Sequence, residues 1–212
     1  AYECLRSLLF LDAAVAGEGA ALGLGLLLLG SGAAAAAAAN ELLSYSKETQ
    51  HEKIGRACSL ALALISFQRE EAADELIEQC LAEADSLIRY GGAFAIGLAY
   101  CNTGKESAVK RLLHIAVSDV SDDVRRAAVL SLVFVLCSHK EELLRILLLL
   151  CSSHNPHVRH AAAVAAGVSL AASGNKEAAD ALQTLTADPV DFVRQAANPQ
   201  FSTPKSPSCA NE

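Results

Sequence analysis

The chain has 212 residues, which suffice for one large domain or two small ones. It carries 17 Lys and Arg residues against 24 Asp and Glu residues, giving a formal net charge of -7. This balance argues against a nucleic-acid partner, because a phosphate-binding face needs clustered basic residues. Hydrophobic residues make up 52% of the chain and aromatic residues only 5%, so we expect a folded protein with a core of Ala, Leu, Val and Ile. Such small side chains suit closely packed helices.

The first residue and the cysteines of the chain indicate how the chain arose and which redox compartment it occupies. The first residue is Ala1 and methionine is absent, which predicts a fragment or a processed product. The 7 cysteines are scattered without a CxxC pair, so we expect buried thiols in a reducing compartment, with neither a disulfide framework nor a four-cysteine zinc site.

One uncharged stretch, residues 19–39, has the length of a membrane span. Its glycines and alanines, and the lack of a flanking basic cluster, argue against insertion into a membrane. A signal peptide is not expected either, because no basic segment precedes the apolar run. Neither a membrane nor a nucleic acid is therefore an expected partner.

A short motif recurs along the chain, with an arginine near the start of a segment of small residues. The arginines are separated by 33, 36, 34 and 35 residues, at Arg56, Arg89, Arg125, Arg159 and Arg194. An earlier copy, residues 16–21, places Glu18 38 residues before Arg56. Self-similarity at such a period is typical of stacked repeats.

Each repeat is predicted to contain two helices. The first begins near the arginine and continues through small and aliphatic residues, as in 93–100, and a Gly/Asn turn such as 102–104 follows. The second is amphipathic, as in 108–115. An acidic or Asn-containing turn then precedes the next arginine, where Asp or Asn can cap the helix. The predicted fold is an all-α solenoid or toroid of helix–turn–helix, HEAT-like repeats of about 35 residues.

The repeats are expected to occupy residues 1–197 as about six helical pairs, incomplete at both ends. The alanine run 33–39 fits poorly, because it is a homopolymer where a second helix should carry a mixed face. Residues 198–212 contain three prolines close together and are predicted to form a disordered tail. Helix faces left uncovered at both ends predict that the isolated chain self-associates.

Several strings resemble the proteasome/cyclosome repeat family. They are residues 48–54, 89–95, 113–126, 155–159 and 190–195. The resemblance covers about residues 8–197. It implies a non-catalytic scaffold segment of the base of the 26S proteasome regulatory particle, in cytoplasm and nucleus. Such a segment would support ubiquitin-dependent degradation by holding the ATPase ring, the lid and a ubiquitin receptor in place. The family's flanking regions are absent, so receptor binding by this chain alone is not expected.

The recurring arginines suggest a structural role. We hypothesise that they reach the turn of a neighbouring repeat and form an inter-repeat ladder with its polar residues. The ladder would comprise the arginines Arg89, Arg125, Arg159 and Arg194 and the partners Asp85, Asp122, Asn155 and Asp191. The alternative is a set of solvated helix arginines.

The most metal-like group in the chain has ligand-type residues at three-residue spacing, Cys151, His154, His157 and His160. Zinc takes such ligands. However, Asn155 and Pro156 separate a helix end from a new helix start, so these side chains would not share one face. We therefore predict no catalytic, cofactor or metal site. Two alternatives remain open, a generic HEAT-like adaptor and a metal-dependent enzyme at this cluster.

Overall fold

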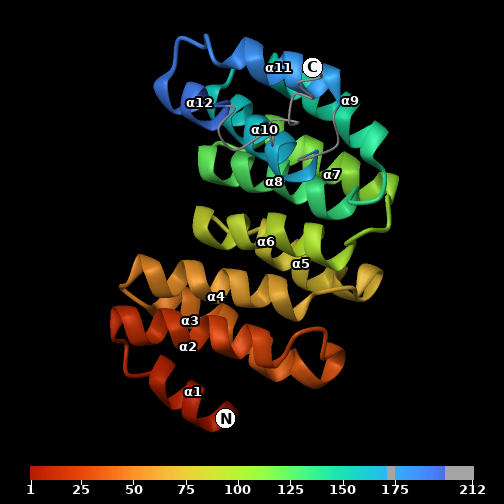
Figure 1. Cartoon of the computed structure of the whole chain (residues 1–212). Coiled ribbons are helices and arrows are strands. Elements are labelled where there is room, and N and C mark those ends of the chain that lie inside the picture. The colour runs from red at the N-terminus through yellow and green to blue at the C-terminus, as the bar shows by residue number, and fades with distance from the viewer. Residues whose placement is uncertain (171–174, 199–212) are drawn as a thin grey trace, which may run out of the picture. The chain divides into compact units, whose positions relative to one another are not determined.

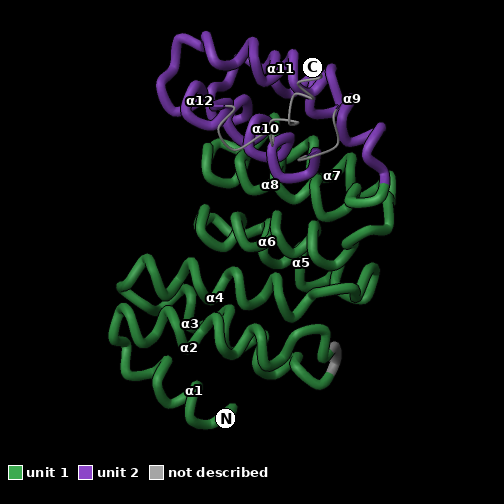
Figure 2. Tube along the Cα trace, viewed as in Figure 1, with its two compact units in different colours: residues 1–138 green, residues 139–212 purple. Residues whose placement is uncertain are grey.

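A computed structural model describes residues 1–170 and 175–198, apart from the side chains of residues 32 and 33. Within these ranges the regular secondary structure is entirely helical, as predicted. None of the helices there is long and apolar enough to cross a membrane. Residues 171–174 and residues 199–212, which include most of the predicted tail, lie outside the described residues. The chain divides into two compact units, residues 1–138 and 139–212, which are described separately (Figure 2).

Unit 1 consists of α-helices and two short 3-10 segments. These are α1 (Tyr2–Leu9), α2 (Ala14–Leu27), η1 (Gly32–Ala35), α3 (Ala36–Glu48), α4 (Glu52–Ile65), η2 (Glu70–Ala73), α5 (Asp74–Leu81), α6 (Ser86–Ala99), α7 (Glu106–Ser118) and α8 (Asp122–Val135). The even-numbered helices are the predicted first helices of each repeat. Helices α3, α5 and α7 are the predicted second helices.

The first helices of unit 1 pack against one another in chain order, α2 on α4, α4 on α6 and α6 on α8 (Figure 1). Each second helix packs mainly on the first helix that follows it, so α3 pairs with α4, α5 with α6 and α7 with α8. Turns of only three or four residues join these pairs, at 49–51, 82–85 and 119–121. The packed hairpin therefore joins the second half of one sequence repeat to the first half of the next.

Glycines let the first helices approach closely. A Cβ placed on Gly97 of α6 would lie 2.8 Å from the Cβ of Ser131 in α8. One placed on Gly91 would lie 2.6 Å from the carbonyl oxygen of Ser59 in α4. Real side chains do not approach that closely, so these two positions exclude a larger residue at the present helix spacing.

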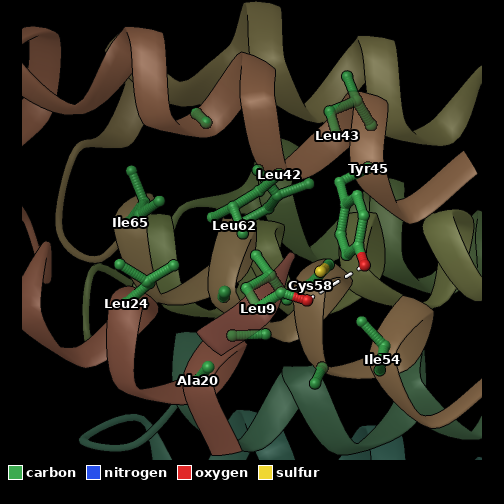
Figure 3. Packing of buried hydrophobic residues seen from close by; sticks show 14 of the residues in the cluster. Leu9, Ala20, Leu24, Leu42, Leu43, Tyr45, Ile54, Cys58, Leu62 and Ile65 are labelled. Atoms are coloured by element: carbon green, nitrogen blue, oxygen red, sulfur yellow. Dashed lines mark hydrogen bonds between the residues drawn. The ribbon is translucent and has the colours of Figure 1, made fainter. Parts of the chain in front are cut away.

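The core of unit 1 begins under α1 and continues between the helix layers (Figure 3). Leu9, Leu24 and Leu62 are almost fully buried there. The hydroxyl of Tyr45 donates to the Leu9 carbonyl at 3.1 Å and to Asp12 Oδ1 at 2.9 Å, which satisfies its polar end at the edge of an apolar cluster. The alanine run continues from η1 into the first turn of α3, where its members Ala38 and Ala39 are buried.

Unit 2 contains α9 (Lys140–Cys151), α10 (Pro156–Ser169), α11 (Lys176–Leu185) and α12 (Asp191–Ala196). Helix α10 packs on α9 and α12, and α11 contacts α9 and α10. A small core forms around Ala163, Leu185 and Val193, with Phe192 packed against it. The hairpin arrangement of unit 1 recurs here, since α9 pairs with α10 across the turn at 152–155.

Candidate functional site: arginine bridges between successive turns

Arg89 connects two successive interhelical turns of unit 1. It is the fourth residue of α6, and its Nη1 donates to the carbonyls of Glu83 and Ala84 in the turn before that helix, at 3.0 and 2.6 Å. Its Nε and Nη2 donate to the two carboxylate oxygens of Asp119 in the next turn, at 2.9 and 3.1 Å. We call this arrangement, one arginine bonded to its own turn and to the aspartate of the next, an arginine bridge.

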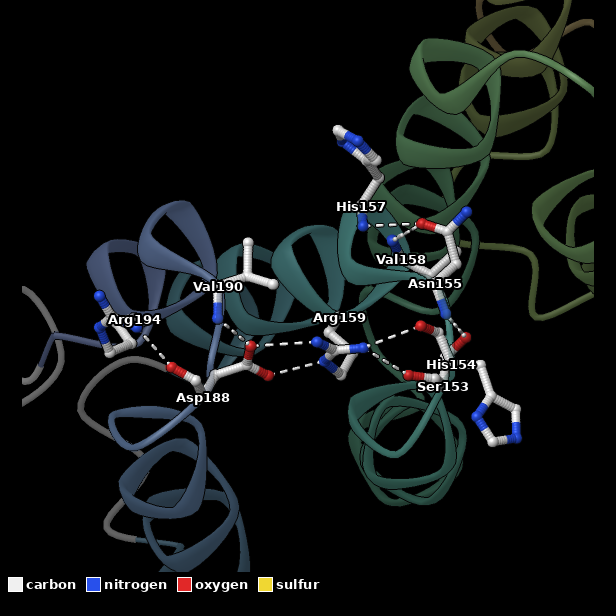
Figure 4. Close-up of polar contacts among 9 residues, drawn as sticks. All are labelled: Ser153, His154, Asn155, His157, Val158, Arg159, Asp188, Val190 and Arg194. Carbon is white, nitrogen blue, oxygen red and sulfur yellow. Dashed lines mark hydrogen bonds and ion pairs between the residues drawn. The ribbon is translucent and has the colours of Figure 1, made fainter.

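The same bridge recurs in unit 2 at Arg159, the fourth residue of α10 (Figure 4). Its Nη1 donates to the carbonyls of Ser153 and His154 at 2.9 and 3.1 Å. Its Nε and Nη2 donate to Asp188 at 2.7 and 3.0 Å. The planar guanidinium suits this role, because its donors form a rigid fork that matches a carboxylate.

A local hydrogen bond within the turn holds the side chain that carries the carboxylate. In four of the turns, one side chain accepts a hydrogen bond from the backbone N–H two residues further along the chain. The accepting residue stands six positions before the fourth residue of the helix that follows the turn. The pairs are Thr49 with His51, Asp119 with Ser121, Ser153 with Asn155, and Asp188 with Val190, at 3.2, 2.8, 3.3 and 2.9 Å. Such local bonds are a property of Asp, Asn, Ser and Thr in turns. Where the residue is aspartate, its carboxylate is also available to the preceding arginine.

Both bridges are largely sheltered from solvent. The side chains of Arg89 and Asp119 are 13% and 12% exposed, and those of Arg159 and Asp188 are 14% and 6% exposed. Burial alone would raise the pKa of Asp119, but hydrogen bonds from Arg89 and the Ser121 N–H outweigh it and hold that pKa below its usual value. The hydrogen bond from Arg159 likewise lowers the pKa of Asp188. Both carboxylates are therefore anionic near neutral pH.

The remaining two predicted arginines form part of the same pattern. Arg125 donates from Nε to the Asp119 carbonyl at 2.5 Å, and Arg194 donates from Nη1 to the Asp188 carbonyl at 2.7 Å. Each also contacts the aspartate three residues earlier in its own helix, Asp122 and Asp191 respectively. These two contacts lie within a helix and do not connect repeats.

The predicted partners Asp85 and Asn155 have a different role. The Asp85 carboxylate caps α6 by accepting from the Leu87 N–H at 2.9 Å. The Asn155 amide oxygen caps α10 by accepting from His157 N–H at 2.8 Å and Val158 N–H at 3.4 Å. The capping role expected for this turn is thus confirmed for both residues. The inter-repeat carboxylates are instead those of Asp119 and Asp188, which the ladder hypothesis did not include.

The alignment on Arg56 is wrong by one position. The third residue of each of these helices is a buried aliphatic residue. In chain order these residues are Ile54, Ile88, Val124, Val158 and Val193. The fourth residue of α4 is therefore Gly55, and Arg56 is the fifth and lies on another face. There its guanidinium stacks over the Tyr90 ring, 5.1 Å from the ring centre, and lies 3.8 Å from Asp123.

A second set of bonds connects the opposite ends of the first helices in unit 1. Gln68 and Asn102, which follow α4 and α6, adopt left-handed backbone conformations with φ of 54° and 62°. Their N–H groups donate to the carbonyls of Leu98 and Phe134 in the next first helix, at 3.0 and 2.8 Å. Carbonyls in the last turn of a helix lack intrahelical partners. In α6 and α8, a carbonyl near the end of the helix thus accepts from the backbone of the repeat before it.

The Cys/His group does not converge on a common point. Figure 4 shows the rings of His154 and His157 pointing away from each other. The His157 ring stacks on Phe192 with a centroid separation of 4.9 Å, and His160 meets the same ring edge-on at 5.6 Å. Cys151 packs against the small core of unit 2. Across the described ranges, no group of three or more His, Cys, Asp or Glu residues is placed to hold a metal ion.

Unit 1 is therefore an array of α-helical hairpins joined at both edges by polar contacts, and unit 2 repeats the hairpin and the arginine bridge. A model of HEAT repeats matches residues 109–198. The chain is an α-helical repeat protein of the HEAT-like class.

Three relatives are similar in sequence to most of this chain. Over 196 residues, 92% of this chain, it is 54% identical to 26S proteasome non-ATPase regulatory subunit 1 homolog B of Arabidopsis thaliana, covering 19% of that protein. It is likewise 54% identical over 196 residues to the 26S proteasome regulatory subunits RPN2 of Candida glabrata and Saccharomyces cerevisiae, covering 21% and 20% of them. The chain is similar to these proteasome regulatory subunits over most of its own length, which confirms the resemblance read from its sequence. It spans about a fifth of the length of these relatives.

Proposed function

We propose that this chain is a scaffold segment of the 26S proteasome regulatory particle. It acts by holding other subunits in place and performs no chemistry itself. The observation that carries the proposal is the 54% identity over 196 residues to RPN2 of Saccharomyces cerevisiae, named as a 26S proteasome regulatory subunit. In this role its partners are the ATPase ring, the lid and a ubiquitin receptor, in the cytoplasm and nucleus, and its activity supports ubiquitin-dependent protein degradation.

The structure supports a mechanical role. A scaffold must keep its binding surfaces at fixed spacing, and each repeat of a solenoid contacts only its neighbours. The Arg89–Asp119 pair fixes one edge of unit 1 and the bond from Asn102 N–H to the Phe134 carbonyl fixes the other. Two separated attachment points resist rotation of one hairpin against the next better than one does.

A segment exchange tests the proposal directly. The aligned 196-residue segment of yeast RPN2 is replaced by the matching part of this chain in the full-length yeast subunit. A tagged ATPase subunit is then used to purify the regulatory particle. We expect the chimera to be recovered with ATPase and lid subunits in the same ratio as native RPN2. A soluble, helical chimera that is absent from the purified particles would contradict the proposal.

Matched variants separate loss of fold from loss of assembly. A chimera carrying Arg89→Ala and Arg159→Ala removes both arginine bridges and should be recovered less well. A chimera carrying Arg126→Ala removes a half-exposed contact with Asp123, three residues earlier in the same helix, and should behave as the parent chimera. Equal recovery of all three chimeras would show that the bridges are not needed for assembly.

We also propose that the isolated chain self-associates. Leu11, Val15 and Leu26 are 69%, 77% and 62% exposed around α1 and α2, so an apolar surface faces solvent there. Repeat arrays without polar end caps bury such surfaces by association. Light scattering coupled to size exclusion, at micromolar concentration, should give a mass above that of one chain. A monodisperse monomer of 22.1 kDa would refute this proposal.

A further inference from the structure

Two cysteines occupy successive turns on one edge of unit 1. Cys101 lies in the turn after α6, and Cys137 lies in the turn after α8. Relative to the motif arginines Arg89 and Arg125, both cysteines are at the same place in their repeats, twelve positions further on (101 − 89 and 137 − 125). Equivalent positions in stacked repeats are spatial neighbours.

Three hydrogen bonds hold these two turns together. Asn102 N–H donates to the Phe134 carbonyl at 2.8 Å, and Gly104 N–H donates to the Val135 carbonyl at 3.0 Å. The Ser138 N–H donates to Asn102 Oδ1 at 3.1 Å. Asn102 directly follows the first cysteine and Ser138 directly follows the second. The backbone is therefore bonded next to both cysteines.

The two thiols differ in access. Cys137 is exposed, whereas Cys101 is half-buried. Burial, and then the proximity of the Cys137 sulfur, raise the pKa of the Cys101 thiol. Neither cysteine is bonded to another in this structure. Cys58 and Cys80 are buried, so they are not accessible to a dissolved oxidant.

We propose that Cys101 and Cys137 form a redox-active dithiol, which a hydroperoxide converts to a disulfide linking two neighbouring repeats. The exposed Cys137 is the sulfur that is oxidised first, and Cys101 is the resolving thiol. The cross-link lies directly before residue 138, where unit 1 ends. It would tie the α6–α7 turn to the α8–α9 turn at the edge where the backbone bonds already join them.

The reaction has two balanced steps. The Cys137 thiolate attacks a peroxide oxygen, the O–O bond breaks, and the products are a Cys137 sulfenic acid and, after protonation, water. The Cys101 sulfur then attacks the Cys137 sulfur, the S–O bond breaks, and the leaving hydroxide takes up the Cys101 proton as a second water. Two thiols thus lose two electrons to one hydrogen peroxide. A dithiol reductant reverses the cross-link.

Mass spectrometry of the full chain tests the proposal. The reduced chain is treated with a small excess of hydrogen peroxide under native conditions, alkylated and digested with trypsin. We expect one cross-linked species that joins the peptide containing Cys101 to the peptide containing Cys137, lost on reduction. Oxidised chain should also unfold at a higher urea concentration than reduced chain, because the cross-link restricts the unfolded state.

Two serine variants assign the order of the steps. In Cys101→Ser the Cys137 sulfenic acid has no resolving thiol, so dimedone should label Cys137 more strongly than in the unsubstituted chain. In Cys137→Ser, Cys101 should take up little dimedone. Both positions are in turns, so helical content measured by circular dichroism should be unchanged.

A trivalent arsenical, phenylarsine oxide, provides a test of proximity that does not depend on redox chemistry. It should bind both thiols in one adduct and protect them together from alkylation, and it should protect neither in the two variants. The proposal fails if dimedone labels Cys137 equally with and without Cys101 and no peptide joins the two. It also fails if the arsenical leaves both thiols open to alkylation.

Discussion

Arg159 donates two hydrogen bonds to the carboxylate of Asp188, a residue 29 positions further along the chain. Its third nitrogen donates to the turn that precedes its own helix. One side chain therefore satisfies two backbone carbonyls and one buried acid. The bridge links the α9–α10 turn to the α11–α12 turn, two elements that the sequence places in different repeats.

Removing a bridging arginine should destabilise the unit that contains it. Arg89→Ala leaves the mostly buried Asp119 with only the Ser121 N–H as a partner, and we expect a loss of about 2–3 kcal/mol in the free energy of unfolding, as for hydrogen bonds to charged groups. Arg89→Lys should recover only part of this, because an ammonium group lacks the fork. Urea unfolding followed by circular dichroism provides the measurement. Arg126→Ala is the control and should change stability by about 0.5 kcal/mol or less. Equal effects of Arg89→Ala and Arg126→Ala would indicate that Arg89 is a solvated helix arginine.

Acid should weaken the bridges. The pKa values of Asp119 and Asp188 are lower in the folded chain than the unfolded value of about 3.9. The unfolded state therefore binds more protons, and the stabilisation is complete above that value and is lost as the pH falls through the folded pKa. The double variant Asp119→Asn, Asp188→Asn should be less stable than the unsubstituted chain at pH 7. Urea midpoints measured from about pH 6 to about pH 3 should show this gap narrowing with acidification. A gap that stays constant would mean that these carboxylates are not the source of the stability that is lost in acid.

Close helix contacts predict opposite effects for two glycine substitutions. Gly97→Ala places a methyl group against Ser131 and should cost about 1–3 kcal/mol through overpacking. Gly19→Ala, in α2, has no heavy atom within 4 Å of the new Cβ, and should stabilise the helix by about 0.5–1 kcal/mol. Thermal or urea unfolding of both variants gives the comparison. Stabilisation by Gly97→Ala would show that α6 and α8 can separate at little cost.

Thiol alkylation should follow burial. Burial raises the pKa of the Cys58 thiol to about 12, and burial with a contribution from Glu83 raises that of Cys80 to about 11. Because the thiolate is the reactive form, both cysteines should resist iodoacetamide in the native chain. Cys4 and Cys137 are exposed and should react first. Peptide mapping after a timed reaction ranks the cysteines, and urea should make Cys58 and Cys80 react as well. Early labelling of Cys58 in native chain would mean that α4 opens locally.

The sequence alone predicted the fold class, and the ladder hypothesis included Arg89 and Arg159, whose side chains connect successive turns. Periodicity was sufficient for this, because each repeat must bury the same face. The pairing of helices could not be predicted in the same way. A repeat counted from Arg89 contains α6 and α7, yet α7 packs chiefly on α8, because a three-residue turn joins those two helices.

The carboxylates of the bridges were missed for a geometric reason. The acids chosen, Asp85, Asp122 and Asp191, are close to an arginine in sequence, and the true partners Asp119 and Asp188 are about thirty residues away. One signal was available, since Asp119 and Asp188 both stand six residues before the next motif arginine. The alignment on Arg56 failed similarly, because arginine identity was given more weight than the buried aliphatic Ile54.

The bonds from the Gln68 and Asn102 N–H groups to Leu98 and Phe134 use main-chain atoms only. Any residue that tolerates a left-handed backbone can supply that N–H, and every residue supplies the carbonyl. Mutation can therefore alter the side chains at this edge without breaking the joint. Homologous chains can diverge here in surface chemistry, and hence in the molecules they recognise, while the rise from one hairpin to the next is preserved.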